Sequence, residues 1–414
     1  MLSMTDFFRA FSKADFPRFF RGVVLSMAGA ALLMNLTASW KAYRNEPLRE
    51  AASRSLMAEE SSFFYASGLA EPVPVAALKL AMAAGAEPDK AVRLEGLAVF
   101  AVLAALTFFV LRARFGEAAA AMAVLFLSAN PYMGYYAMQG SSHLYALVFL
   151  LLFWHYFDAP EHSAADALLA GLSGGLACLC RADAALALLV LAAASWALKR
   201  RAFGLKRAGQ ALGLALLLAL PYAVYQKTHY GSGFYAQELS LRRWATIDRY
   251  GYRPPGYSGL WPSEDGRTPA PAGPLGAAAF VLRAGPAGAL REAAAGLGRA
   301  LLHELPRILY YKFLLVLVFL GLYAAAALGK ERLLFFLAAG LLPVLPLASI
   351  NQVPAAGGIE LRYYLWSLWA LCALAGLGFQ ETLAWVETGI KEWVAGRIEP
   401  LVKAGGKSKR KVSR

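Results

Sequence analysis

The stretch "GLACLCRADAALAL" (residues 175–188) lies inside 35 residues, 164–198, that are almost all apolar or small. As a single helix, these residues would be roughly 50 Å long, whereas the hydrocarbon core of a bilayer is about 30 Å thick. In a membrane this segment therefore predicts two short spanning helices joined by a turn at residues 181–183. The turn places Arg181 and Asp183 at a membrane surface rather than at mid-depth.

The composition of the whole chain supports the membrane interpretation. Of the 414 residues, 59% are hydrophobic and only 16% are charged, and the mean hydropathy is +0.48. A soluble protein carries roughly 25% charged residues. Because the backbone in lipid must satisfy its own hydrogen bonds, the apolar runs are expected to be helices, which predicts an all-α polytopic membrane protein. We expect about ten spans, at residues 20–39, 94–111, 118–136, 143–157, 165–180, 183–198, 208–226, 307–328, 333–350 and 363–380.

Basic residues flank alternate ends of these spans and predict the orientation. One side collects the N-terminal arginines and lysines, the pair Arg112 and Arg114, the run at 199–207, the pair Lys330 and Arg332, and the C-terminal tail "KAGGKSKRKVSR". By the positive-inside rule this side is cytoplasmic, with both termini, and the N-terminal segment is favoured as a retained anchor over a cleaved signal peptide. The net charge of +14 follows from these clusters and does not indicate nucleic-acid binding.

The predicted topology divides the chain into two regions. Residues 1–380 form the membrane domain, with two large extracytoplasmic loops at about 40–92 and 227–306. In the second loop, residues 276–304 are typical of a helix lying in the membrane surface, broken at Gly285-Pro286. Residues 381–414 are expected to be a cytoplasmic amphipathic segment and a basic tail that meets anionic headgroups.

The first outer loop supplies candidate acid–base groups. Its composition predicts a helix over residues 46–58, with Glu46 and Glu50 one turn apart on one face. A carboxylate here is placed to act as a general base on an acceptor hydroxyl. The competing interpretation is a solvated amphipathic helix without catalytic function. The other carboxylates of the loop are Glu59, Glu60 and Glu71.

Several other residues have both a binding and a structural interpretation. Arg181 suits a phosphate group, since a guanidinium makes bidentate charge-assisted bonds, but it is equally suited to pair with Asp183. The same alternatives apply to Arg362 at the outer start of the last span. His143, at the start of the fourth span, is more typical of a hydrogen-bonded structural residue than of a catalyst. Cys178 and Cys180 lack the further ligands of a zinc site. The sequence requires no cofactor and leaves a divalent metal undetermined.

The motifs, in this order, resemble the GT-C superfamily of membrane glycosyltransferases, in particular the protein O-mannosyltransferase and aminoarabinose transferase branch. "NEPLREAASRSLM" and "EPVPVAALKLAM" resemble the acidic juxtamembrane helix and the proline-containing segment that follows the first span. "FLSANPYMGYYAMQGSSHLYALVFLLLFWHYF" resembles the next hairpin. "LAGLSGGLACLCRADAALALLVLA" resembles the helix pair with an arginine at its turn, and "LRYYLWSLWALCALAG" resembles the late span.

The resemblance implies a site and a reaction. A sugar is transferred with inversion from a polyprenyl-phosphate carrier to a hydroxyl of a lipid, glycan or protein at the extracytoplasmic face of the cell membrane. It implies Glu46 as the base, with Glu59, Glu60 and Glu71 as alternatives. It implies substrate-binding roles for Asn45, Arg181, Asp183, Arg362 and His143.

Two departures from the family pattern keep other functions open. The first acidic pair reads Asn45-Glu46, and the second acidic place reads Ser141-Ser142-His143. The alternatives are therefore a transporter or flippase of a lipid-linked glycan and an inactive relative in envelope assembly. Few ionisable groups lie inside the spans, which argues against transport.

Overall fold

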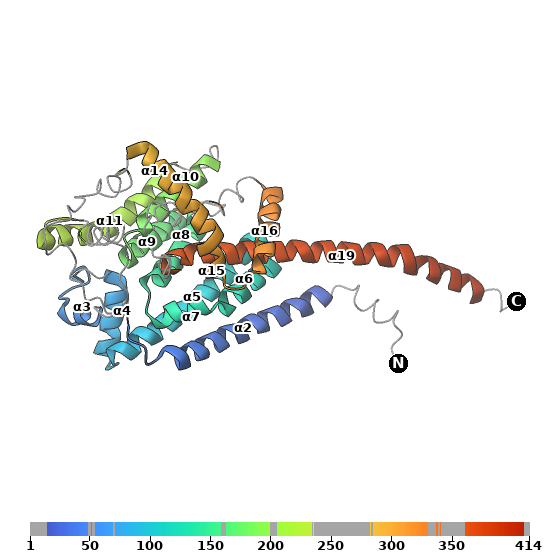
Figure 1. The fold of residues 1–414 in the computed structure, drawn as a ribbon, viewed down its shortest axis with the longest axis horizontal. Helices are drawn as coiled ribbons and strands as arrows, with labels where there is room; N and C mark the ends of the chain where they lie inside the picture. The colour runs from blue at the N-terminus through green and yellow to red at the C-terminus, as the bar shows by residue number, and fades with distance from the viewer. Residues whose placement is uncertain are drawn as a thin grey trace.

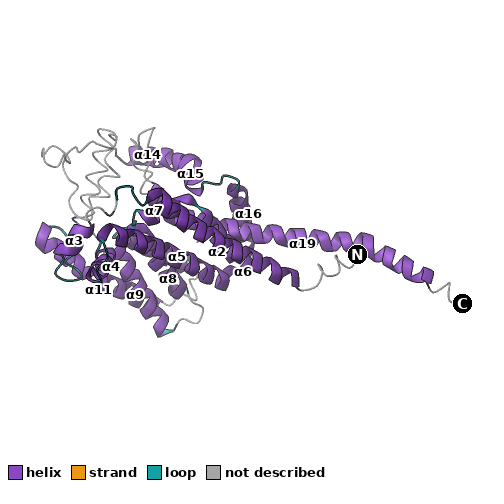
Figure 2. Ribbon diagram, turned by 90° about the horizontal axis from the view of Figure 1, so that it is seen from below, coloured by secondary structure: helices purple, strands orange, loops and turns teal. Residues whose placement is uncertain are grey.

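The computed structural model describes residues 15–48, 51, 54–68, 71–158, 163–198, 205–233, 235, 282, 285–329, 337, 340 and 361–409. Over these residues the regular structure is helical and contains no strand (Figure 2). The all-α fold predicted from the sequence is confirmed. The expected span at 333–350 and most of the second outer loop lie outside the described residues.

The helices follow the chain in a fixed order (Figure 1). They are α2 (Asp15–Tyr43), α3 (Arg54–Glu60), α4 (Pro72–Ala83), α5 (Pro88–Phe115), α6 (Glu117–Ala129), α7 (Pro131–Met138), α8 (Ser142–Phe157), α9 (Ala164–Cys180), α10 (Ala184–Leu198), α11 (Leu205–Tyr230), α14 (Gly285–Arg299), the π-helix η2 (Ala300–Glu304), α15 (Leu305–Leu309), α16 (Leu314–Leu328), the 3₁₀ turn η3 (Leu361–Tyr364) and α19 (Leu365–Lys409).

The hairpin predicted around residue 181 is confirmed. Helix α9 begins at a capping box, in which the Ser163 hydroxyl accepts from the backbone of Asp166 and the Asp166 carboxylate accepts from Ser163. It ends at Cys180, and α10 begins at Ala184, so Arg181–Asp183 form the connecting turn. Both helices are short, with 17 and 15 residues, as the division of 35 apolar residues into two spans requires.

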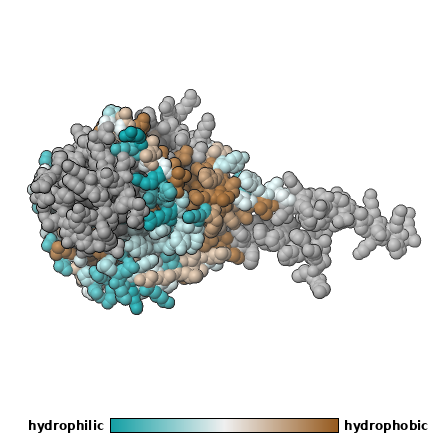
Figure 3. Space-filling model, in the orientation of Figure 1, coloured by the Kyte–Doolittle hydropathy of each residue, from teal (hydrophilic) through white to brown (hydrophobic). Residues whose placement is uncertain are grey.

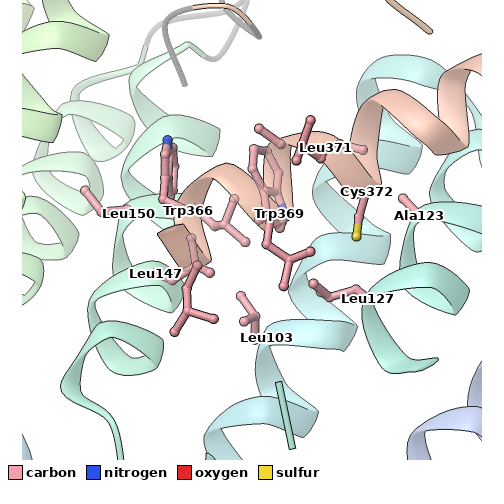
Figure 4. Packing of buried hydrophobic residues seen from close by; sticks show 14 of the residues in the cluster. Leu103, Ala123, Leu127, Leu147, Leu150, Trp366, Trp369, Leu371 and Cys372 are labelled. Atoms are coloured by element: carbon pink, nitrogen blue, oxygen red, sulfur yellow. The ribbon is translucent and has the colours of Figure 1, made fainter. Parts of the chain in front are cut away.

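Helix α19 is the centre of the packed core. Trp366, Trp369 and Cys372 on α19 are buried against leucines of α5, α6 and α8 (Figure 4). Contact between α19 and α16 depends on glycine, because a Cβ at Gly378 would lie 2.0 Å from the Leu317 carbonyl oxygen. Small residues that let two backbones approach are typical of helix pairs in membranes.

Two expected spans are broken in the structure. The span at 118–136 is interrupted at Asn130, where α6 ends and α7 begins with Pro131, and α7 and α8 are then bent by 113°. The span at 307–328 is interrupted between Leu309 and Leu314, where the helical segments on either side are bent by 112°. The breaks pack together, since the Asn130 side-chain amide donates to the carbonyl oxygens of Ile308 (2.9 Å) and Leu309 (3.3 Å).

The expected count of ten spans is not confirmed by helix length. Among the described residues, four helices are long and apolar enough to cross a membrane, or six if each bent pair forms one span. Four further apolar helices have 10–17 residues. Short or broken apolar helices of this kind need a thin or distorted bilayer, or neighbours that cover their ends.

The arrangement of the long helices gives the molecule two distinct ends. The beginning of α2 and the far end of α19 lie at the same end, while α3 and α4 lie toward the other (Figure 1). The 181–183 turn lies beside the start of α4, since Arg181 is 3.8 Å from Glu71. With 45 residues, α19 is roughly 68 Å long and extends beyond the packed helices. The face of Figure 3 carries its apolar surface over α16, between more hydrophilic regions.

Candidate functional site

Four elements distant in the sequence meet at one place. These are the residue before α4 (Glu71), the first turn of α8 (Ser142 and His143), the turn between α9 and α10 (Arg181 and Asp183), and η3 (Tyr363). Each side chain stands at or beside a helix end, where the backbone of the following helix is already fixed by packing. The site is thus built on rigid elements rather than on a long loop.

Arg181 is the central residue of the site. Its Nε and Nη2 donate to Asp183 Oδ1 and Oδ2, both at 2.9 Å, which is the bidentate geometry of an arginine–carboxylate pair. Its remaining nitrogen, Nη1, donates to Ser142 Oγ (3.4 Å) and lies 3.8 Å from Glu71 Oε1. The guanidinium carbon also lies 5.9 Å from the ring centre of Tyr363. Arg181 is therefore held in one orientation from three sides.

Arg181 remains protonated although its side chain is largely buried. Its side chain is only 20% exposed, and this desolvation lowers the pKa of the guanidinium. Asp183 and Glu71 act in the opposite direction and outweigh it, so that the pKa is raised above its ordinary value. The site consequently keeps a fixed positive charge at every physiological pH.

Glu71 is the second carboxylate beside Arg181. It directly precedes Pro72, the first residue of α4, and its Oε1 accepts a hydrogen bond from Ser142 Oγ (3.4 Å). Ser142 thus lies between the carboxylate and the guanidinium and contacts both. Glu71 is only partly buried, so a substrate hydroxyl can reach the same carboxylate.

His143 and Arg362 approach the site through Tyr363. The rings of His143 and Tyr363 meet edge to face at 5.1 Å, and Arg362 Nη2 donates to the Tyr363 hydroxyl (3.4 Å). His143 Nδ1 lies 3.3 Å from Ser141 Oγ, while its Nε2 is buried without a hydrogen-bond partner in the described structure. The structural interpretation of His143 therefore explains only one of its two ring nitrogens.

A cavity of about 110 Å³ opens beside Arg181. His143, Arg181, Asp183 and Tyr363 give it a polar end, and side chains of α8, α10 and the start of α19 give it apolar walls. Trp366 lines it as well, and the indole Nε1 of this buried residue has no hydrogen-bond partner within the described part of the chain. The cavity therefore has apolar walls, the guanidinium of Arg181, and two nitrogens, His143 Nε2 and Trp366 Nε1, that have no hydrogen-bond partner in the described structure.

The first outer loop departs from its expected structure. Residues 44–48 form a turn and an extended segment, and helix begins only at Arg54, so the helix expected over 46–58 is wrong in its first half. The reason is local: α2 continues to Tyr43, where the Glu46 amide closes a turn, and Pro47 disfavours a helical conformation at Glu46. Glu50 lies outside the described residues.

The structure brings together some of the predicted site residues and not others. Glu71, Arg181, Asp183 and His143 meet, and Arg362 joins them through Tyr363. No ion pair or hydrogen bond among the described residues links Glu46 or Asn45 to Arg181, and Asn45 is exposed. Glu59 and Glu60 are exposed on α3.

Sequence reasoning missed Ser142, Tyr363 and Trp366 as site residues. Ser142 and Tyr363 lie inside the motifs that resemble the family, but nothing local distinguishes them from ordinary helix-end residues.

The sequence also did not indicate the role of Arg93, which is buried in α5 and donates to the carbonyl oxygens of Tyr43 (3.0 Å), Met138 (3.3 Å) and Glu46. Arg93 stands between Lys90 and Glu95, so nothing in the local sequence distinguishes it from the charged residues beside it.

The described residues contain no group of three or more histidine, cysteine, aspartate and glutamate side chains able to hold a metal ion. Cys178 and Cys180 are free thiols on α9, and Cys180 is buried against Tyr145 and Ala146. They serve as small packing residues in the helix, and the site described above does not use them.

Comparison with known proteins finds a family similar to the middle of the chain. Residues 70–225 match the family model described as dolichyl-phosphate-mannose-protein mannosyltransferase. No curated protein matches the chain. A solved structure of an Archaeoglobus fulgidus oligosaccharyltransferase, tethered with an acceptor peptide, is 14% identical, with a TM-score of 0.47. That match covers 89% of this chain, which spans about half (50%) of the archaeal chain.

The matched segment contains α4–α10 and most of α11, and with them Glu71, Ser142, Arg181 and Asp183. Residues 70–225 are thus similar to this mannosyltransferase family, and the described part of the chain carries helices long and apolar enough to cross a membrane. The predicted resemblance to the protein mannosyltransferase branch of the GT-C membrane glycosyltransferases is thereby confirmed over residues 70–225.

Proposed function

We propose that this protein transfers a sugar from a polyprenyl-phosphate carrier to an acceptor hydroxyl at the extracytoplasmic face of the cell membrane. The observation that carries the proposal is the cavity beside Arg181, where a fixed guanidinium stands at the entrance to an apolar interior and a carboxylate lies 3.8 Å from it. A lipid-linked sugar phosphate combines the same two chemistries in one molecule. The acceptor is a lipid, a glycan or a protein.

Glu71 is the base in this proposal, in place of Glu46, which the family resemblance implies. The carboxylate of Glu71 takes the proton of the acceptor hydroxyl, and the freed oxygen attacks the anomeric carbon of the sugar. The bond from that carbon to the phosphate oxygen breaks, and its electron pair leaves with the polyprenyl phosphate. Arg181 stabilises the negative charge of this leaving group. A single displacement of this kind inverts the anomeric configuration.

Ser142 and Asp183 support the two reacting groups. Asp183 occupies two donors of Arg181 and fixes the plane of the guanidinium, which leaves Nη1 toward Ser142 and Glu71. Ser142 orients the carboxylate through its hydrogen bond. Groups that are already oriented need no reorganisation as charge develops, which is the main source of electrostatic catalysis.

The test is complementation of a deletion strain, followed by mass spectrometry of its envelope glycolipids and glycoproteins. Glu71→Gln and Arg181→Ala are expected to abolish the modification restored by the wild type, at least about 100-fold, because they remove the base and the phosphate charge. Glu59→Gln is the matched control, since Glu59 is exposed on α3 of the same loop.

Glu46→Gln separates the two candidate bases. Loss of transfer in Glu46→Gln with full transfer in Glu71→Gln would return the base to Glu46. Full transfer in both Glu71→Gln and Arg181→Ala would refute the site. Transport of a fluorescent lipid-linked sugar by the purified protein in vesicles, without any transfer, would favour a flippase.

A further inference from the structure

Aromatic side chains from two distant segments gather at the end of the molecule that carries α3 and α4 (Figure 1). Phe63 and Phe64, in the loop after α3, are 56% and 40% exposed, and Tyr230, the last residue of α11, is 36% exposed. The two segments are in contact, because the rings of Phe63 and Tyr225 meet edge to face with centres 6.3 Å apart. We call this surface the aromatic platform, and it consists of Phe63, Phe64, Tyr225, His229 and Tyr230.

The platform is held in one arrangement by contacts beneath it. The hydroxyl of the buried Tyr222, on α11, donates to the carbonyl oxygen of Gly68 (3.2 Å) and so ties the end of α11 to the loop after α3. The rings of Tyr230 and Tyr235 stack with their centres 5.1 Å apart and their planes within 9°. A ligand that binds to rings fixed in this way does not have to order them first, which lowers the entropy cost of binding.

The edge of the platform offers hydrogen-bond acceptors to a ligand. His229 Nδ1 lies 2.9 Å from the carbonyl oxygen of Tyr225. A carbonyl oxygen only accepts, so this nitrogen carries the proton, and in the neutral ring the other nitrogen, Nε2, is an acceptor. His229 is exposed, and so is Glu60, whose carboxylate is close enough to act electrostatically on Tyr230. Aromatic rings and exposed acceptors therefore stand side by side.

This combination matches the chemistry of a neutral sugar. The face of an aromatic ring carries partial negative charge and attracts the weakly positive C–H groups on the face of a sugar ring, while the hydroxyls of the sugar donate to acceptors at the edge. The Glu60 carboxylate would instead repel an anionic headgroup. An extended peptide binds most readily to the edge of a sheet, and the described part of the chain contains no strand.

The platform adjoins the carboxylate proposed as the base. Gly68, which accepts from Tyr222, is three residues before Glu71, and the Glu71 carboxylate is close enough to act electrostatically on the Tyr222 hydroxyl. A sugar ring bound on the platform thus lies beside the group that would deprotonate a hydroxyl of the same glycan.

We infer that the acceptor is a neutral glycan, one sugar ring of which stacks on the aromatic platform while a hydroxyl of the chain meets Glu71. The inference rests on the proposed function in taking Glu71 as the base. It goes further by selecting the glycan from the three classes of acceptor, and by assigning its recognition to Phe63, His229 and Tyr230.

The test is equilibrium binding to the full-length protein in nanodiscs, followed by saturation-transfer NMR. The probes are two neutral hexasaccharides, cellohexaose and α-1,6-mannohexaose, and a threonine-rich dodecapeptide. Wild-type protein is expected to bind at least one hexasaccharide and not the peptide. Phe63→Ala removes a stacking face and His229→Ala removes an acceptor, and each is expected to weaken the binding of that hexasaccharide about two- to tenfold.

Phe109→Ala is the matched control, because Phe109 is exposed to a similar degree (61%) on α5 and lies outside the platform. Phe63→Trp keeps an aromatic face and is expected to retain binding. Failure of both hexasaccharides to bind, or wild-type affinity in both Phe63→Ala and His229→Ala, would overturn the inference. Binding of the peptide alone, lost in Phe63→Ala, would replace the glycan by a protein acceptor.

A fluorescent label distinguishes a glycan platform from rings that sit in the membrane interface. The label is attached at Ser62→Cys in a variant with Cys178, Cys180 and Cys372 replaced by alanine, since Ser62 is exposed beside Phe63. Its emission is expected to be quenched by iodide in solution and protected by the bound hexasaccharide. Quenching by spin-labelled lipid and not by iodide would assign the rings to the interface and overturn the inference.

The outcome is separable from that of the proposed function. Hexasaccharide binding that depends on Phe63 and His229, in a protein without any sugar transfer, would leave the platform standing as a glycan site and refute the transferase. Sugar transfer that depends on Glu71 and Arg181, with an unchanged KM for the acceptor in Phe63→Ala and His229→Ala, would leave the transferase standing and refute the platform.

Discussion

At the scale of single residues, two buried arginines explain how an irregular loop is held against the helices. Arg93 of α5 donates to the carbonyl oxygens of Tyr43 and Glu46 on one side and of Met138 on the other. Arg54 of α3 donates to the carbonyl oxygen of Gly140 (2.8 Å). Both therefore bind the first outer loop to the turn that leads into Ser142.

Replacing Arg93 tests this role. Arg93→Met keeps the length of the side chain but leaves three backbone carbonyls without their donor, and is expected to lower the free energy of unfolding by about 2 kcal/mol or more. Arg112→Met is the control, since Arg112 is exposed on the same helix. In a variant with Cys178 and Cys180 replaced by alanine, thermal unfolding followed by thiol labelling of the buried Cys372 measures both. Equal midpoints for the two variants would contradict the role.

The positions of some site residues could be predicted from the sequence, and those of others could not. Arg181 and Asp183 could be placed at a surface turn because that argument needs only the length of one apolar run. Glu71 could not be preferred to Glu46 in the same way. Its contact with Arg181 spans 110 residues and requires α4 to lie beside the start of α8, which no local pattern encodes.

At the scale of elements, the fold depends on close contact between helix backbones. A Cβ added at Gly378 of α19 would lie 2.0 Å from the Leu317 carbonyl oxygen, and one added at Gly321 of α16 would lie 1.9 Å from that of Leu374. These glycines face one another across the pair, so the contact is reciprocal. Backbone atoms cannot rotate away as a flexible side chain can.

Gly378→Ala is therefore expected to push α16 and α19 apart and to destabilise the protein by about 1–3 kcal/mol. Gly389→Ala on the same helix is the control, because nothing lies within 4 Å of the Cβ that it adds. The same Cys372 labelling assay applies, since Cys372 is on α19. A stability of Gly378→Ala equal to that of Gly389→Ala would show that the two helices are not packed as described.

The breaks in two of the expected spans could not be predicted from hydropathy. Both breaks lie between apolar segments and interrupt them for only a few residues, so a hydropathy pattern predicts one span each. The break at Asn130 is stabilised by the carbonyl oxygens of Ile308 and Leu309, about 178 residues further along the chain. Asn130-Pro131 was a visible local signal, since proline begins a helix more readily than it continues one.

At the scale of the whole molecule, α5 and α8 run side by side and are tied at both ends. Near the site, the Tyr145 hydroxyl donates to Glu95 Oε2 (3.1 Å), and at the other end Arg114 pairs with Asp158. With 28 residues, α5 is roughly 42 Å long, enough to carry its two ends to opposite membrane surfaces. The site and the basic turn at 112–114 are therefore on opposite sides.

Because the site and the basic turn lie at opposite ends of α5, the charge pattern predicts which membrane face each of them occupies. The basic turn belongs in the cytoplasm by the positive-inside rule, which puts Glu71 and Arg181 outside. In a variant with Cys178, Cys180 and Cys372 replaced by alanine, a single cysteine at Ser62 is expected to react with a membrane-impermeant maleimide added to intact cells. A single cysteine at Ala113 is expected to react only after the cells are opened. Ser62 and Ala113 are both exposed, so labelling of both from the outside would place the site and the basic turn on one face and contradict the helix length and the charge argument together.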